Sequence, residues 1–176
     1  MDILAAFGLS ASAGLNAYIP LLIVSLLAKF TDLIVLSEPW NAMESWWVIG
    51  VLILLSAIEF FTDKIPAVDH INDAIQTFIR PTAGAILFAA SAQVVTDINP
   101  IISIIVGLLV AGTVHAVKSV VVRPAVTATT AGLGDAPVSF LEDGIATALS
   151  VLSIALPSVV GVVLILLAIL IIWWLV

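Results

Sequence analysis

The sequence contains no cysteine, and only 10% of its 176 residues carry a charge. Without cysteine the chain can form no disulfide, thiol nucleophile or thiolate metal site. Only five residues are Lys or Arg, against twelve Asp or Glu, and the formal net charge of −7 argues against nucleic-acid binding. The chain also lacks HExxH, GxSxG and Walker patterns, so no catalytic motif supports an enzyme and no cofactor is expected.

Apolar residues dominate instead: they make up 62% of the chain, and its mean hydropathy is +1.30. A soluble domain of this length cannot bury so much apolar surface, so lipid is the expected solvent. We therefore predict an all-α, polytopic integral membrane helix bundle, formed as a single domain over residues 1–176 and surrounded by membrane lipids. The N-terminus lacks the basic region of a cleavable signal peptide, so the first apolar stretch is expected to remain as a span.

Six apolar stretches approach the ~20 residues that a helix needs to cross a bilayer. They cover residues 5–28, 46–61, 82–95, 101–122, 138–156 and 159–176. Gly, Pro or Thr interrupt two segments, near residues 8–20 and 125–137, where we predict broken or re-entrant backbone. Irregular backbone at membrane depth is tolerated only inside protein or beside water. For residues 125–137 a surface linker is the alternative.

The few cations indicate an orientation. Lys64, Arg80, Lys118 and Arg123 fall on one side of a six-span arrangement, and Lys29 falls on the other. Because Lys and Arg concentrate in cytoplasmic loops, we expect both termini to lie in the cytoplasm.

A short amphipathic helix is predicted near residues 69–79, with Asp69 as its capping residue. Its apolar face would carry Ile71, Ala74, Ile75 and Phe78, and its polar face Asn72, Asp73, Gln76 and Arg80. We interpret this segment as a cytoplasmic helix that lies on the membrane or folds over the bundle. A helix packed against neighbouring spans, with no further role, is the alternative.

Glu59 is the charge that most requires an explanation, because it lies inside an apolar span. An ionisable side chain there costs several kcal/mol unless it is paired or hydrated. Asp63 lies four residues later, on the same helix face, and two close carboxylates suit a proton carrier or a cation site. The structural alternative is that Asp63 and Lys64 end the span at the interface, while Glu59 pairs with Arg80 or Lys118.

Two further spans carry polar candidates. His115 and Lys118 share a stripe of the fourth span, and a His beside a Lys can carry protons near neutral pH. A hydrogen-bonded interior His is the alternative. Glu142 and Asp143 begin the fifth span, where they either face a polar site or complement the helix dipole.

The two broken segments add the last candidates. If residues 125–137 re-enter the bilayer, Thr130 and Asp135 would contribute to a solute or ion site. The stretch from Ser12 to Asn16 is similar to residues 130–134, and broken segments in matching places mark transporter sites; chance similarity is the alternative. The candidate solute- or ion-binding residues are Asn16, Glu59, Asp63, Lys64, Arg80, His115, Lys118, Arg123, Thr130, Asp135, Glu142 and Asp143. Metal binding is left open, with Asp69, His70 and Asp73 as weak candidates for a divalent site.

These polar residues stand in stretches that resemble a family of bacterial inner-membrane proteins catalogued only as a domain of unknown function. The matching stretches are residues 8–11 and 14–20, Glu59 with residues 63–66 and Asp69, residues 79–81, residues 115–130, Ser139, and residues 142–143. The resemblance implies a location in the bacterial inner membrane and one shared polar site. It implies no activity.

The leading hypothesis is a transport or permeation protein for a small solute or ion, assembled as a homo-oligomer. A lipid-binding or scaffold protein is the main alternative, and a membrane-embedded hydrolase that uses Glu59, or His70 with Asp73, is a third. We expect six residues to converge in the cytoplasmic half of the bundle: Glu59, Lys64, Arg80, His115, Lys118 and Arg123. A position of Glu59 that faces lipid, or lies beyond ~10 Å of these cations, would contradict this expectation.

Overall fold

The computed structural model describes residues 2–63, 66–92 and 98–175, and every regular element assigned within them is helical. The all-α prediction is therefore confirmed. The elements are α1 (Ile3–Leu15), α2 (Tyr18–Phe30), the 3₁₀ turn η1 (Trp40–Glu44), α3 (Trp46–Thr62), α4 (Pro66–Ala92), α5 (Pro100–Val117), the π-helical turn η2 (Lys118–Val122), α6 (Arg123–Thr130), α7 (Asp135–Ala155) and α8 (Pro157–Leu175).

Several helices begin where the sequence supplies a capping oxygen. The side chain of Asp2 accepts from the amide of Leu4 at the start of α1, and Ser45 caps α3 through the amide of Val48. Asn99 accepts from the amide of Ile101, with Pro100 in the first turn of α5. These side chains satisfy amides that have no partner inside the helix, and proline loses nothing at a position whose amide is unpaired anyway.

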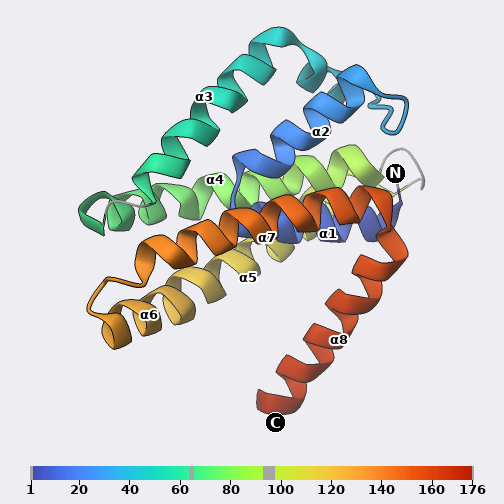
Figure 1. The fold of residues 1–176 in the computed structure, drawn as a ribbon. Helices are drawn as coiled ribbons and strands as arrows, with labels where there is room; N and C mark the ends of the chain where they lie inside the picture. The colour runs from blue at the N-terminus through green and yellow to red at the C-terminus, as the bar shows by residue number, and fades with distance from the viewer. Residues whose placement is uncertain (1, 64–65, 93–97, 176) are drawn as a thin grey trace.

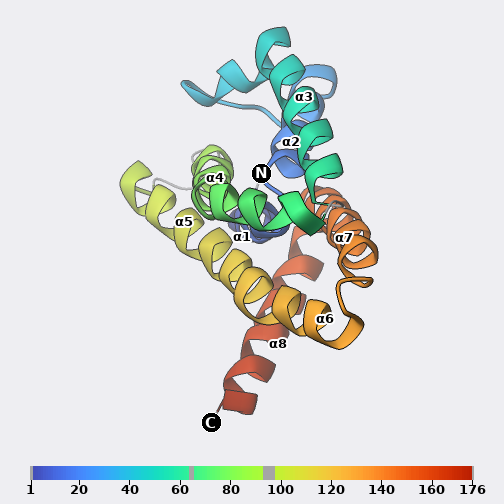
Figure 2. The same ribbon diagram turned by 90° about the vertical axis from the view of Figure 1, so that its left-hand side faces the viewer.

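Helix α1 forms the centre of the bundle. It packs against α4, α5, α7 and α8, while α2 and α3 lie together on one side and α8 leads away from the other (Figures 1 and 2). The backbones at the centre approach closely: a Cβ atom added to Gly107 of α5 would lie 2.5 Å from the carbonyl oxygen of Gly84 in α4. Small residues at such contacts allow helices to pack without a large apolar core between them.

The interior of the bundle contains small polar side chains, whereas many large apolar side chains point outward. The hydroxyl of Ser12 lies 2.7 Å from that of Ser150, and Ser10 donates to the carbonyl of Gly84 at 2.8 Å. Trp47 and Phe78, in contrast, are 88% and 78% exposed. Two helical segments, residues 100–130 and 135–155, are long and apolar enough to cross a membrane.

The first predicted span, residues 5–28, is divided into two helices. α1 ends at Leu15, Asn16 has an extended backbone, and α2 begins at Tyr18. α2 turns back from the end of α1 toward the end of the molecule where α1 starts (Figure 1). The predicted break near residues 8–20 is thus a reversal between two helices of 13 residues each.

The separate amphipathic helix near residues 69–79 is a wrong prediction. Residues 66–92 form the single helix α4, and Pro81 lies inside it rather than at the start of a new helix. Pro81 removes one backbone donor, but packing against α1 and α5 holds the helix together on both sides of it.

The predicted break over residues 125–137 is also wrong in its extent. α5, η2 and α6 continue one helical path to Thr130, and only residues 131–134 form a turn before α7 begins at Asp135. Ala131 and Gly132 have positive φ angles of 51° and 84° in this turn. The threonine-rich stretch tolerates the helix because Thr127 and Thr129 bond their hydroxyls to carbonyls one turn earlier.

Candidate functional site

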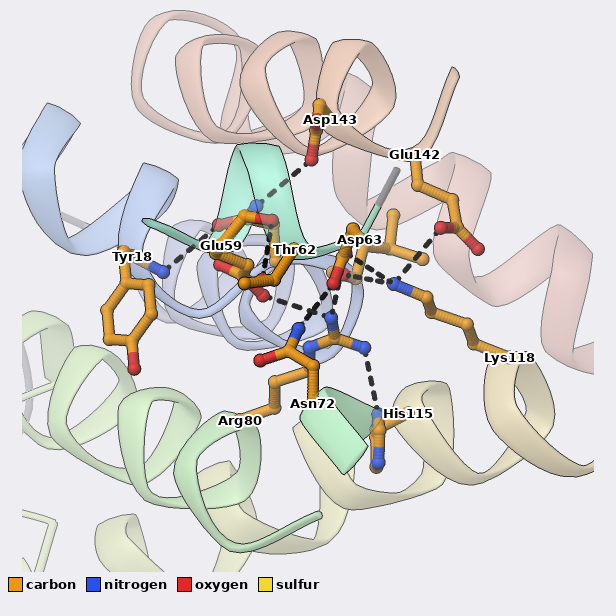
Figure 3. Close-up of polar contacts among 12 residues, drawn as sticks. Tyr18, Glu59, Thr62, Asp63, Asn72, Arg80, His115, Lys118, Glu142 and Asp143 are labelled. Carbon is orange, nitrogen blue, oxygen red and sulfur yellow. Dashed lines mark hydrogen bonds and ion pairs between the residues drawn. The ribbon is translucent and has the colours of Figure 1, made fainter. Parts of the chain in front are cut away.

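The end of α3 brings two carboxylates into contact with Arg80 of α4. The Nη2 atom of Arg80 lies 3.0 Å from Oε1 of Glu59 and 3.6 Å from Oδ2 of Asp63 (Figure 3). Glu59, Asp63 and Arg80 are all at most 2% exposed. An isolated charge at this depth would be very costly, and the guanidinium offsets part of the cost for both acids.

A second set of contacts joins α3 to the helical path from α5 to α6 and to α7. Lys118 Nζ lies 3.0 Å from Glu142 Oε2 and 4.0 Å from Asp63 Oδ2. Arg123 Nη2 lies 2.6 Å from Glu142 Oε2 and 3.8 Å from Asp63 Oδ2. We call the six side chains that these pairs connect the ion network: Glu59, Asp63, Arg80, Lys118, Arg123 and Glu142. It contains three cations and three carboxylates, so its formal charge is zero.

The π-helical turn η2 explains how Lys118 and Arg123 both reach Glu142. Five positions apart on a regular α-helix, they would point about 140° away from each other. In η2 the amide of Arg123 instead donates to the carbonyl of Lys118. This wider turn brings both side chains toward one face, and such π turns are frequent at functional sites.

His115 extends the ion network from Arg80 toward Thr77. The Nη1 atom of Arg80 lies 3.1 Å from His115 Nδ1, and His115 Nε2 lies 3.1 Å from the hydroxyl of Thr77. A guanidinium has only donors, so Nδ1 must accept and the ring proton sits on Nε2. His115 is therefore a neutral imidazole in this arrangement, held between a donor and a hydroxyl.

The break between α1 and α2 lies next to the ion network. Lys118 Nζ donates to the carbonyl of Leu15, the last residue of α1, at 3.0 Å. Asn16 accepts from the amides of Tyr18 and Ile19 at 3.1 and 3.0 Å, and its own amide donates to Asp143 Oδ1 at 3.0 Å. Side chains of the candidate site thus provide hydrogen-bond partners for the backbone carbonyl at the end of α1 and for the backbone amides at the start of α2.

Two buried oxygen atoms beside Arg80 have no hydrogen-bond partner among the residues that the structure describes. They are Oε2 of Glu59 and Oε1 of Gln76, on side chains that are 1% and 2% exposed. The side chain of Tyr18 hydrogen-bonds Gln76 and lies within electrostatic range of Glu59. A buried acceptor without a donor is costly, so this corner is suited to receive a proton, a water molecule or a cation.

Helix α4 turns its polar face toward the bundle interior. Asn72, Gln76 and Arg80 are four residues apart, and the side-chain amide of Asn72 donates to Asp63 Oδ1. On the apolar face, Ile75 and Phe78 are 53% and 78% exposed. The amphipathic pattern was recognised from the sequence, but the bundle interior, rather than water, covers its polar side.

The structure separates some predicted site residues from the ion network. Thr130 and Asp135 lie at the α6–α7 turn, where Thr130 accepts from the amide of Gly134 and Asp135 accepts from the Thr127 hydroxyl at 2.8 Å. Lys64 lies outside the described residues, as do the side chains of Asp69, His70 and Asp73. Within the described part of the chain, no three His, Cys, Asp or Glu side chains gather as metal ligands would.

Sequence reasoning left four contributors out of the candidate site: Tyr18, Asn72, Gln76 and Thr77. The spacing of Asn72, Gln76 and Arg80 was a usable signal, because residues four apart share a helix face. The carbonyl of Leu15 carried no signal, since any residue provides a backbone oxygen.

A hollow of about 430 Å³ lies beside the ion network, between α7 and the helical path from α5 to η2. Its lining is mostly apolar, but Lys118 and Glu142 reach it, together with Leu15 at the end of α1. The Lys118–Glu142 pair therefore borders open space on one side.

Comparison with known proteins gives one match, to a family model described as "Domain of unknown function (DUF4126)", which covers residues 3–176. No curated protein and no solved structure matches the chain.

Proposed function

The chain belongs to the DUF4126 family, whose model covers it almost completely, and from this premise we propose that it is a small transport protein of the bacterial cytoplasmic membrane. Its substrate would be a small solute or ion, and a small cation agrees best with the geometry. The observation that carries the proposal is the broken helix α1–α2, whose two ends meet a buried ion network in the bundle. Discontinuous helices that end at buried charges are the usual binding sites of membrane transporters.

The distribution of side chains supports the membrane location. Large apolar residues cover the outside of α3, α5 and α8, while the interior combines an apolar core with buried serines and the ion network. A soluble protein rarely exposes so many large apolar side chains or buries so many charges. Lipid can cover such an exterior without cost, because it needs no hydrogen bonds from the protein surface.

The reversal at Asn16 leads us to propose a topology that differs from the six expected spans. Neither α1 nor α2 is long enough to cross a hydrocarbon core of ~30 Å, since each has 13 residues. We propose that they enter and leave from one side, and that α3, α4, α5 with its extension to α6, α7 and α8 cross the bilayer. With the ion network near the cytoplasm, α1 then starts on the outer side and α8 ends inside.

Glu59 is the residue that we expect to take part in transport. One of its carboxylate oxygens binds Arg80, and the other has no hydrogen-bond partner among the described residues. A proton or a small cation arriving at this oxygen would weaken the pair with Arg80. The guanidinium could then shift its contacts toward Asp63, 3.6 Å away, and toward His115. An exchange of this kind couples occupancy of the site to the packing of α3 against α4.

The test is ion flux into proteoliposomes of the purified protein. A potassium gradient with valinomycin imposes a membrane potential, and a pH-sensitive dye reports proton entry. We expect flux above that of empty vesicles, and loss of most of it in Glu59→Gln, which keeps the shape of the side chain but cannot ionise. Asp32→Asn is the matched control, because Asp32 is an exposed carboxylate outside the ion network.

Two results would contradict the proposal. In the first, protons enter vesicles that contain the wild type no faster than they enter empty vesicles. In the second, Glu59→Gln retains the full flux of the wild type.

Lipid handling is a second candidate, favoured by the hollow between α7 and the path from α5 to η2. Its apolar lining could take an acyl chain, with the Lys118–Glu142 pair beside the headgroup. In that case mass spectrometry of the protein released from native membranes would detect bound lipid. Bulky Trp at Ile145, which lines the hollow, would remove that lipid.

A further inference from the structure

The ammonium group of Lys118 occupies an unusual position for a lysine. Lys118 is 3% exposed, and its Nζ atom contacts the Leu15 carbonyl and Glu142 Oε2, each at 3.0 Å. Asp63 Oδ2 lies at 4.0 Å, so the three donors of the ammonium face three oxygen atoms. These oxygens come from three different helices: the last residue of α1, the residue that follows α3, and Glu142 in the third turn of α7.

The oxygen from α1 is itself suited to a cation. Leu15 ends a helix of 13 residues, and its carbonyl stands at the negative end of the helix dipole. In membrane transporters, the C-terminal ends of half-helices and the carbonyls of unwound backbone coordinate monovalent cations. Two carboxylates complete a set of hard oxygen ligands of the kind that alkali and alkaline-earth cations prefer.

We propose that the end of α1, Asp63 and Glu142 form a binding site for one monovalent cation, and that the ammonium of Lys118 fills it as a tethered occupant. The inference deepens the proposed transport function, because it names the ion at the broken helix. A sodium ion has no place among these oxygens while the ammonium of Lys118 occupies them.

Charge balance sets the valence of the site. The surrounding ionic groups are Asp63 from the end of α3, Arg80 from α4, Arg123 from α6 and Glu142 from α7. With Glu59 and Lys118 the network is neutral, so removal of the amine leaves one uncompensated negative charge. One monovalent cation restores neutrality, whereas a divalent cation would leave an excess positive charge in a buried position.

Space for the replacement is present in the structure. Leu15, Lys118 and Glu142 border the same hollow of about 430 Å³, so truncation of the lysine opens a path to the oxygens. The substitution Lys118→Ala should therefore create an accessible cation site. Lys118→Met is the matched control, because it removes the charge but keeps an apolar side chain of similar length in the place of the amine.

The experiment measures the melting temperature of the purified full chain in detergent, followed by its tryptophan fluorescence. Samples contain sodium chloride, potassium chloride or choline chloride at equal ionic strength. For Lys118→Ala we expect the melting temperature to be higher in sodium than in choline, and this increase should saturate as the sodium concentration rises. The rise should be roughly 3 to 6 °C once sodium exceeds its dissociation constant about tenfold. The wild type and Lys118→Met should melt at the same temperature in sodium and in choline.

A double variant identifies the ligands. When Glu142→Gln is added to Lys118→Ala, sodium should no longer raise the melting temperature, because one of the two carboxylate ligands has been replaced by a neutral amide. If Lys118→Ala does not fold, Lys118→Gln takes its place, since its amide is polar and leaves the same negative charge unbalanced.

Three outcomes would overturn the inference. The melting temperature of Lys118→Ala could show no sodium-specific increase, Lys118→Met could show an equal increase, or the increase could be undiminished when Glu142→Gln is added to Lys118→Ala. These outcomes are independent of flux. Sodium stabilisation without transport would preserve the site and refute the proposed function. Flux in the wild type without sodium stabilisation of Lys118→Ala would support the proposed function and refute the cation site.

Discussion

Arg80 offers the sharpest test of how the buried charges hold the bundle together. It is fully buried, it pairs with Glu59 and Asp63, and it donates to His115. In Arg80→Met, Asp63 retains Lys118 and Arg123, but Glu59 loses the cation nearest to it. Breaking a buried pair on one side typically costs about 3–5 kcal/mol, because it leaves a charge that is neither hydrated nor paired.

The double variant Arg80→Met with Glu59→Leu should regain most of this loss. It removes one cation and one carboxylate, so the ion network remains neutral with two of each. Replacing a buried ion pair by apolar side chains is often neutral or stabilising. We therefore expect Arg80→Met to lower the free energy of unfolding by about 3 kcal/mol or more. The double variant should have a free energy of unfolding within about 1.5 kcal/mol of that of the wild type.

The assay is reversible unfolding in mixed micelles with an increasing fraction of sodium dodecyl sulfate. A thermodynamic cycle over the wild type, both single variants and the double variant gives the coupling energy. A coupling energy below about 0.5 kcal/mol, the limit expected for independent sites, would refute the reasoning. In that case Glu59 and Arg80 would be hydrated separately rather than bound to each other.

Two further predictions concern packing and topology. Gly107→Ala should destabilise the protein by about 1–3 kcal/mol, because its Cβ would meet the Gly84 carbonyl. Gly50→Ala should increase the free energy of unfolding by about 0.5–1 kcal/mol, because the space around Gly50 is open. The same unfolding assay compares the two variants. Single cysteines at Asn41 and Ser158 should react with an impermeant thiol reagent from the periplasmic side, whereas one at the exposed Leu133 should not; the opposite labelling pattern would contradict the proposed orientation.

Composition and helix periodicity were sufficient to predict that the chain is all-α and to predict most helix ends. The observed α3 and α7 begin within three residues of the predicted spans 46–61 and 138–156. The separate helix predicted near residues 69–79 failed because Pro81 does not end α4: a proline within a helix is tolerated where neighbouring helices hold both halves in place. Local propensity contains no information about those neighbours.

The charged residues of the candidate site were predictable, and Arg80 was one of two partners considered for Glu59, but the other ion pairs were not predicted. Glu59, Arg80, His115 and Lys118 are recognisable as candidates because a charge or an imidazole in an apolar stretch has a high desolvation free energy. Which cation meets which carboxylate depends on helix rotation, and in Lys118 and Arg123 on the extra residue of the η2 turn. A π turn has no recognised signal in a single sequence, so the convergence of both cations on Glu142 could only come from the structure.

The neutrality of the ion network has a consequence for how the protein is made. Ribosomes deliver the chain from its N-terminus, so Glu59, Asp63 and the three cations emerge before Glu142 does. Until α7 arrives, the half-built bundle contains two carboxylates against three cations, and its excess positive charge has no counterpart in the interior. Insertion of α7 delivers the missing carboxylate to Lys118 and Arg123 at 3.0 and 2.6 Å. The charge of Glu142 therefore makes the ion network neutral only after all three of its cations have been synthesised.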